Sequence, residues 1–311
     1  MSWVGGLAEW QDGDTLYLSV AFTWKLDEAW SRAIFARAQG LRVRAGGPAL
    51  FLAQMQHKLA DVADVGPDWH DATARHNPLA TMASRGCPVG CWFCIVPKME
   101  GKDFTLIPDF PVRPILCDNN LSALPADYQE WIIARYRAEG VHLIDANSGF
   151  EPRTFTKDVY DRWKSLINEG GGPWRFAYDD MRERAEVHAV FDLLRDEPAR
   201  RKRVYTLVGN EPFEECMQRI LEVLDAGCEP HVQPVIALNS LDRKPLVRHD
   251  WTEQKLYDVA RWVNGFVFRL CSFEEYDRTR SKRKMTEVYD EQQGLFMARE
   301  GKPLTEKGKM P

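Results

Sequence analysis

Three cysteines in one short stretch are the residues whose types and spacing point most directly to chemistry. Cys87, Cys91 and Cys94 follow a C-x3-C-x2-C spacing in a loop that also contains a proline and a glycine. Thiolates are the ligands that iron–sulfur clusters take. Three of them can hold three corners of a [4Fe–4S] cubane, which leaves the fourth iron without a protein ligand. An open coordination position is typical of a catalytic metal centre, so the spacing predicts a catalytic iron–sulfur site.

A structural zinc site is the alternative for the same three cysteines. It would need a fourth Cys or His ligand, and such sites usually show paired C-x2-C spacing. Cys117, His76 and His70 are the candidates nearest along the chain, and none of them has the expected pairing. The cysteines outside the loop fall in strand and helix patterns and are interpreted as small buried apolar side chains: Cys117, Cys216, Cys228 and Cys271.

Length and composition set wider limits. A chain of 311 residues that is 44% hydrophobic and 28% charged can form one large domain or two modest ones. Seven cysteines are an odd number for a disulfide framework. With a net charge of −5, nucleic-acid binding would require a local basic patch. The first ten residues do not resemble a signal peptide, and no apolar run is long enough to span a membrane, so we expect a cytoplasmic protein without membrane contact.

Strand and helix patterns alternate along the chain, which predicts an α/β fold. Residues 16–22, 27–39 and 41–45 read as strand, helix and strand, a small βαβ Rossmann-like unit within residues 1–78. Further strand-like runs, separated by helical patterns, lie near residues 115–118, 141–145, 174–178, 203–208 and 231–238. With the strand expected before the cysteines they make six βα units over residues 79–270, in a parallel sheet that is either doubly wound or curved into a barrel. Residues 271–311 would form a C-terminal extension or tail.

Each strand-like run ends in polar residues. In parallel βα folds the carboxyl ends of the strands carry the chemistry, so these residues should converge on one face. Turn formation and helix capping are the alternative explanation for each group taken alone. The groups are Asp118-Asn119-Asn120, Asp145 with Asn147, Tyr178-Asp179-Asp180, Asn210-Glu211 and Asn239-Ser240.

The cysteine stretch, with Phe93 in the aromatic position of C-x3-C-x-aromatic-C, resembles the motif of the radical S-adenosylmethionine (SAM) superfamily. The resemblance covers about residues 79–270 and implies a partial (β/α)6 TIM-like barrel. It also implies that SAM chelates the open iron and that the reduced cluster passes an electron to the sulfonium. The C–S bond then breaks, and the resulting 5′-deoxyadenosyl radical abstracts hydrogen from a substrate. A flavodoxin- or ferredoxin-type electron donor is a further implication.

The resemblance also implies cofactor contacts from several strand ends. Asp118 and Asn119 stand where the family has a Gly-Gly-Glu stretch, here without its glycines, and a carboxylate or amide oxygen can still accept from an ammonium group. Tyr178 and Asp179 resemble polar positions that bind the ribose or carboxylate of SAM. Across the barrel, the residues expected at the cofactor are Phe93, Asp118, Asn119, Tyr178, Asp179, Gly209, Val235 and Ile236.

The N-terminal unit resembles the Rossmann-like domain of cobalamin-associated and methylthiotransferase-like radical SAM proteins. Asp68-Trp69-His70 is similar to the start of a cobalamin-binding motif, but Thr73 replaces the glycine of that motif, so we predict no cobalamin. No cysteine precedes Cys87. The additional cluster of methylthiotransferases is therefore not expected.

A polar substrate is expected beside the third strand. The side chains after the third strand should face it: Asp145, Asn147, Glu151 and Arg153. The basic stretch at residues 200–203 is expected to be a solvated face or at most a docking patch, and the one at residues 278–284 either contacts phosphates or belongs to a solvated or disordered tail. The leading hypothesis is a radical SAM enzyme acting on a polar substrate such as a nucleotide or nucleic acid. The alternatives are a radical SAM enzyme that modifies a peptide or protein, and a non-enzymatic zinc-binding interaction protein.

Overall fold

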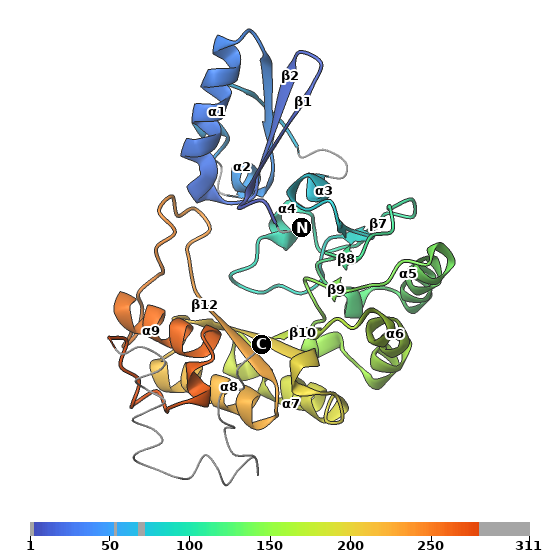
Figure 1. Cartoon of the computed structure of the whole chain (residues 1–311), viewed down its shortest axis with the longest axis vertical. Helices are drawn as coiled ribbons and strands as arrows, with labels where there is room; N and C mark the ends of the chain where they lie inside the picture. The colour runs from blue at the N-terminus through green and yellow to red at the C-terminus, as the bar shows by residue number, and fades with distance from the viewer. Residues whose placement is uncertain (1–2, 53–54, 68–71, 280–311) are drawn as a thin grey trace, which may run out of the picture.

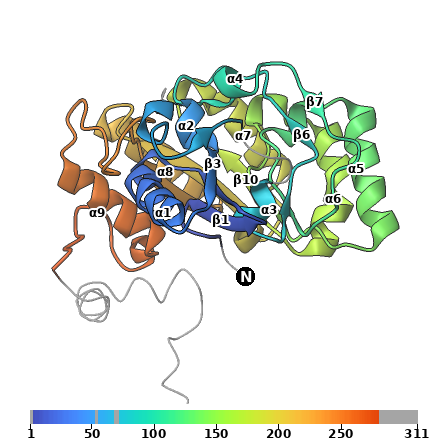
Figure 2. The ribbon, with the colours of Figure 1, turned by 90° about the horizontal axis from the view of Figure 1, so that it is seen from above.

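The computed structural model describes residues 3–52, 55–67 and 72–279, coloured in Figure 1. It is a mixed α/β structure in which an N-terminal unit lies above a larger core (Figure 1). Seen from above, this unit lies over the middle of the molecule, between α9 at one end and α5 and α6 at the other (Figure 2). The segment at residues 68–70, for which we predict no cobalamin, and residues 280–284 of the basic stretch lie outside the described residues.

The N-terminal unit is a four-stranded sheet with strand order β1-β2-β3-β4. Its predicted βαβ pattern is confirmed, because β2 and β3 are parallel and α1 connects them. The sequence analysis missed β1, which pairs antiparallel with β2 through a turn at Gly13. The unit comprises β1 (Leu7–Asp12), β2 (Thr15–Val20), η1 (Thr23–Lys25), α1 (Leu26–Ala38), β3 (Arg42–Gly46), α2 (Pro48–Leu52), η2 (Gln56–Lys58) and β4 (Asp64–Val65), and α3 (Ala72–His76) links it to the core.

The core contains six parallel strands that follow one another in chain order in two three-stranded sheets. The alternation of strands and helices that the sequence predicts is therefore confirmed. Among the described residues no sheet closes into a barrel. One sheet holds β5 (Ala80–Thr81), β8 (Ile115–Leu116) and β9 (Asp145–Ala146), and the other holds β10 (Trp174–Ala177), β11 (Lys202–Val208) and β12 (Glu229–Pro234).

Helices follow the strands, and α5 and α6 show residues suited to their ends. Thr156 accepts a hydrogen bond from the Val159 amide at the start of α6, and Gly140 and Gly171 end α5 and α6 in the left-handed conformation. The remaining core elements are β6 (Ser84–Arg85), α4 (Val96–Met99), β7 (Thr105–Leu106), η3 (Leu121–Ala123), α5 (Ala126–Glu139), η4 (Pro152–Thr154), α6 (Lys157–Gly170), η5 (Met181–Glu183), α7 (Arg184–Leu193), η6 (Ala199–Arg201), α8 (Phe213–Asp225), α9 (Glu253–Asn264) and η7 (Val267–Arg269). Within the described residues no helix is long and apolar enough to cross a membrane.

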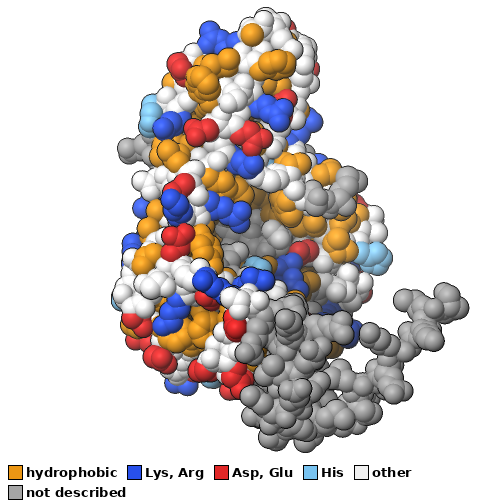
Figure 3. Space-filling view, turned by 60° about the vertical axis from the view of Figure 1, so that its left-hand side comes forward, with side chains coloured by type: hydrophobic (Ala, Val, Ile, Leu, Met, Phe, Trp, Pro, Cys, Tyr) orange, Lys and Arg blue, Asp and Glu red, His pale blue; other side chains and the backbone are white. Residues whose placement is uncertain are grey.

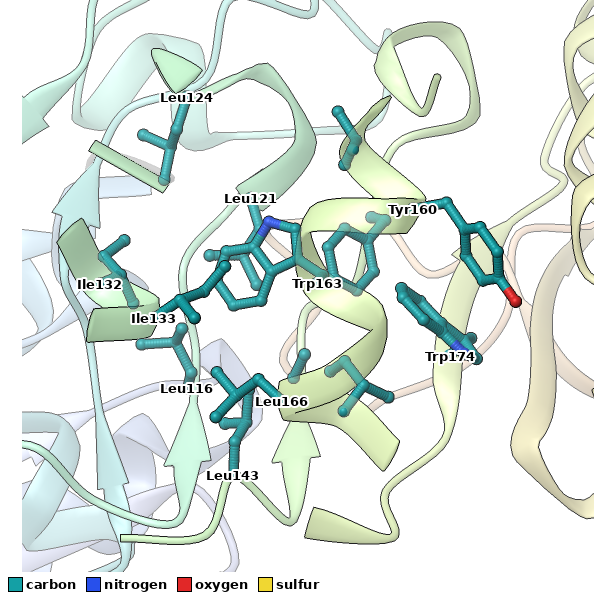
Figure 4. Close-up of a cluster of buried hydrophobic side chains, with 14 of the residues drawn as sticks. Leu116, Leu121, Leu124, Ile132, Ile133, Leu143, Tyr160, Trp163, Leu166 and Trp174 are labelled. Carbon is teal, nitrogen blue, oxygen red and sulfur yellow. The ribbon is translucent and has the colours of Figure 1, made fainter. Parts of the chain in front are cut away.

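Large apolar side chains between the strands and their helices hold the short strands together (Figure 4). Trp163 from α6 and Trp174 from β10 are fully buried there, beside Leu116 from β8. The indole N–H of Trp163 donates to Gln129 Oε1 over 2.9 Å. Burial of this much aromatic surface stabilises strands that have few ladder hydrogen bonds of their own.

The basic stretch at residues 200–203 is only partly the solvated face that the sequence predicted, because Arg200 is exposed whereas Lys202 is buried. Lys202 is 5% exposed and donates to the Ala226 carbonyl, and Arg201 donates to the carbonyls of Ile167 and Gly172. These side chains therefore satisfy carbonyl groups at the amino-terminal side of the core.

The N-terminal unit contacts the loop after β12 as well as the segment before β5. Thr23 Oγ1 donates to the carbonyl of Ser240, and the Arg243 guanidinium lies 5.6 Å from the centre of the Trp24 ring. On the other side, His76 Nε2 and Ser19 Oγ are 3.0 Å apart. The unit thus connects the first and last members of the strand series.

Gly149 allows the chain to leave β9 close to β10. Its φ is +80°, and a Cβ atom on it would lie 2.4 Å from the Arg175 carbonyl oxygen. The next amide, of Phe150, donates to that oxygen over 2.8 Å.

We expect Gly149→Ala to lower the free energy of unfolding by more than about 3 kcal/mol, because the backbone at Gly149 or at Arg175 must move to make room for the added methyl group. Gly140→Ala is the matched control: its φ is +65° with open space around it, so it should lose about 1 kcal/mol. Equal losses in urea unfolding would contradict this assignment.

Candidate functional site

The three predicted cysteines lie in one loop between β6 and α4. The Cys87 amide donates to the Gly101 carbonyl over 3.3 Å, which brings the two ends of the loop together, and the Cys94 amide donates to the Cys91 carbonyl over 3.0 Å. All three are free thiols; Cys87 is buried and the other two are partly exposed. Burial raises the pKa of the Cys91 and Cys94 thiols. Within the described part of the chain, no group of three or more His, Cys, Asp or Glu side chains is arranged to hold a metal ion.

Glu100 follows α4 and holds the start of this loop close to the residue after β8. Its Oε2 accepts from the Gly86 amide over 2.9 Å and from Asn119 Nδ2 over 2.7 Å, and its Oε1 pairs with Arg85 over 2.9 Å. Gly86 has φ +90°, and a Cβ there would lie 2.3 Å from the Asp103 carbonyl oxygen. Sequence reasoning missed Glu100. The feature of the sequence that could have predicted it is a carboxylate directly before Gly101, at the point where the chain comes back to Gly86 and Cys87.

The polar residues after β8 contact the same loop, each in a different way. Asn119 reaches it through Glu100. Asn120 Oδ1 accepts from the Ala123 amide, while its Nδ2 donates to Cys87 Sγ over 3.8 Å. Asp118 is fully buried, and its carboxylate accepts from the Ala83 amide and the Ser84 hydroxyl. The expected contact between Asp118 and a cofactor is therefore not supported, because this side chain positions the segment that leads to Cys87.

The residues after β9 reach the cysteine loop through Arg153. Its Nη2 lies 3.4 Å from Cys91 Sγ, and its Nε donates to Glu151 Oε1 over 2.6 Å. Nη2 also lies 3.3 Å from Glu183 Oε1, on η5 after β10. Glu151 is in turn held in place because its carboxylate caps η4. Two residues predicted to face substrate thus lie beside the predicted cluster ligands.

The other two residues predicted to face substrate have different partners. Asp145 forms a two-point ion pair with Arg175, with N–O distances of 2.6 and 2.7 Å. Arg175 also contacts the Tyr205 hydroxyl. Asn147 bonds the Cys117 thiol through its side chain. Asp145 thus links β9 to β10 through Arg175, and a substrate role for it stays a prediction.

After β10, the structure separates the two neighbouring residues that were predicted to bind the cofactor. Tyr178 is fully buried among apolar side chains under α7 and α8, and its hydroxyl donates to Glu222 over 2.9 Å, so a cofactor role for it is not supported. Asp179 accepts from the Leu207 amide, and its own amide donates to Glu183 Oε2. Burial raises the pKa of Asp179 to about 7.

The remaining predicted cofactor residues lie at the ends of β11 and β12 and in the cysteine loop. Gly209 has φ +90°, and a Cβ atom on it would lie 3.0 Å from Leu256 of α9. Val235 is buried, whereas Ile236 is partly exposed and bridges to Pro245. Phe93 packs edge-on against Trp92 in the loop itself.

The space-filling view shows that the molecule is hollowed between the N-terminal unit and the core, with Lys and Arg side chains at the edge of the hollow (Figure 3).

Comparison with known proteins adds no assignment to this geometry. No protein-family model matches the sequence, and the search of curated proteins gives no match. The site is therefore interpreted from its own residues.

Glu100→Gln should weaken the anchoring of the cysteine loop, because an amide oxygen replaces a carboxylate that accepts three hydrogen bonds. We expect the free energy of unfolding to fall by about 1–3 kcal/mol and the Gly86 amide to exchange its hydrogen faster. Glu139→Gln, which alters an exposed ion pair with Arg135, should change stability by less than about 0.5 kcal/mol. Unchanged exchange at Gly86 in a folded Glu100→Gln protein would refute the anchoring role.

Asp118 should make stability depend on pH, because burial raises its pKa from 3.8 to about 6. Between these values the folded protein holds a proton that the unfolded chain releases, so the free energy of unfolding falls as pH rises from about 4 to 6. Asp118→Asn lacks this loss, and its stability relative to wild type should rise by about 3 kcal/mol over that range. Urea unfolding of both proteins at several pH values measures the difference, and a difference independent of pH would contradict the shift.

Proposed function

We propose that this chain is a radical SAM enzyme whose [4Fe–4S] cluster is held by Cys87, Cys91 and Cys94. The observation that carries the proposal is one loop with three free thiols, two of which accept a side-chain N–H, from Asn120 and Arg153. N–H donors directed at sulfur suit an iron–sulfur cluster. The chemistry of these side chains therefore supports such a cluster, although the three sulfurs are not gathered into a metal-binding arrangement in the described residues. We also propose that the six parallel strands together correspond to a partial (β/α)6 barrel.

The residues around the loop would prepare the site for its cofactors. When bound, the cluster and SAM supply the electron and the 5′-deoxyadenosyl radical that removes hydrogen from a substrate. Glu100 keeps the loop closed, and Asn120 and Arg153 orient two of the sulfurs. Asp179, with its pKa near 7, can accept from a hydroxyl or ammonium group of SAM. Val235 and Ile236 would supply backbone contacts to adenine, as the resemblance implies.

The polar side chains on one face of β11 and β12 support a polar substrate. Burial alternates along β11, so that Val204, Thr206 and Val208 pack toward the helices and Tyr205 lies on the opposite face. His231 of β12 lies beside it, with ring centres 5.1 Å apart. Hydroxyl, imidazole and guanidinium groups on this face suit a nucleotide or a similar polar molecule. A flavodoxin- or ferredoxin-type protein would supply the electron.

Anaerobic reconstitution with iron and sulfide, followed by dithionite and SAM, tests the proposal. We expect a brown protein that forms 5′-deoxyadenosine, detected by mass spectrometry, and Cys91→Ala should abolish that product. Cys271→Ala is the matched control, because Cys271 is a buried thiol packed against α9. A colourless protein that binds zinc would favour the interaction-protein alternative. A fully loaded wild type that forms no 5′-deoxyadenosine would refute the proposal.

A further inference from the structure

Arg153 connects the cysteine loop to the ends of two parallel strands. It follows β9 in the short helix η4, and its guanidinium contacts Cys91 of the loop and Glu183 of η5, which follows β10. The side chain is 35% exposed, whereas its carboxylate partners Glu151 and Glu183 are 16% and 15% exposed. Three segments that are distant in the sequence therefore meet at this one guanidinium.

The position of Arg153 is determined by more than one contact. Glu151 Oε1 accepts from the Arg153 backbone amide over 3.3 Å and from its Nε over 2.6 Å. Glu183 accepts from Nη2, the same nitrogen that lies 3.4 Å from Cys91 Sγ. Because the planar guanidinium is bonded to Glu151 through Nε and to Glu183 through Nη2, its rotation about the side-chain bonds is restricted. One N–H group is thus directed at the Cys91 sulfur rather than at solvent.

A hydrogen-bond donor on a metal-bound sulfur affects the metal in a known direction. The donor withdraws electron density from the thiolate, and the electron added on reduction is then better accommodated. Hydrogen bonds to the sulfurs are one of the ways in which proteins set the reduction potential of a cluster. The same contact limits the rotamers of Cys91, which orients the thiol before metal binds.

We infer that Arg153 is a positioning residue that orients Cys91 and raises the reduction potential of the cluster held by this loop. The inference rests on the proposed function and deepens it. It assigns Arg153 to the cluster rather than to the substrate, where the sequence analysis placed it. If Arg153 instead bound substrate or SAM, its loss would raise the KM for that molecule and leave the potential of the cluster unchanged.

The test is a redox titration of the reconstituted protein without SAM, monitored by electron paramagnetic resonance (EPR). Arg153→Met should shift the midpoint potential to more negative values, with 59 mV for each tenfold loss in the one-electron equilibrium constant. Arg153→Lys keeps the charge but loses the two-edged geometry, so its shift should be smaller. Arg182→Met is the matched control: Arg182 is 83% exposed and pairs with Asp180, and its potential should equal that of wild type.

Iron and sulfide content provides a second readout. Reduced cluster content in Arg153→Met, with full content in Arg182→Met, would support the orienting role of Arg153. Full content with an unchanged potential and an unchanged EPR spectrum in Arg153→Met would overturn the inference, as would an equal shift in Arg182→Met.

The two proposals fail in distinguishable ways. If wild type forms 5′-deoxyadenosine but the Arg153 variants keep its potential and cluster content, the inference fails and the proposed function stands. If wild type takes up no iron–sulfur cluster, both fail. Should Arg153→Met not fold, judged by circular dichroism, the same titration of Arg153→Lys decides, because this variant retains the cation between Glu151 and Glu183.

Discussion

The closure of the cysteine loop at its base is the constraint on which the candidate site depends. Glu100, just after α4, accepts hydrogen bonds from Arg85 and Gly86 at the start of the loop and from Asn119 after β8, and the amide of Cys87 donates to Gly101. A loop of this length would otherwise sample many arrangements of three thiols, and ordering it costs conformational entropy. A largely buried carboxylate with several donors is an effective anchor, because breaking any one of those bonds leaves a charge unsatisfied.

Polar residues at the strand ends divide into two groups with different tasks. Asp118, Asp145 and Tyr178 use their polar atoms on protein partners and thereby hold the strands and the loop in register. Asp179 and Arg153 are partly exposed and lie near the cysteine loop or near residues that contact it. Position at a strand end is common to both groups. A side chain whose polar atoms are bonded to buried protein groups supports the site, whereas a partly exposed side chain near the cysteine loop can also contact a ligand.

Pattern and spacing predicted the fold class well and its details less well. The helices around Ile132, Leu166, Phe191 and Ile220 are all present, because their apolar spacing matches one helix face. The antiparallel strand β1 was missed, since a short strand next to a Gly turn has weak periodicity. The solvated face expected at residues 200–203 holds for Arg200 but not for Lys202, because a local charge run does not reveal the carbonyl groups that Lys202 and Arg201 meet.

The sequence by itself determined the order of strands and helices and the grouping of Cys87, Cys91 and Cys94 in one loop, since both are local properties of the chain. The tertiary structure alone decided that Glu100 closes this loop and that Arg153, 62 residues from Cys91 along the chain, contacts its sulfur. The physical reason is that a hydrogen bond between distant residues depends on how whole elements pack. Residue type shows what a side chain can bind, and packing determines which partner it meets.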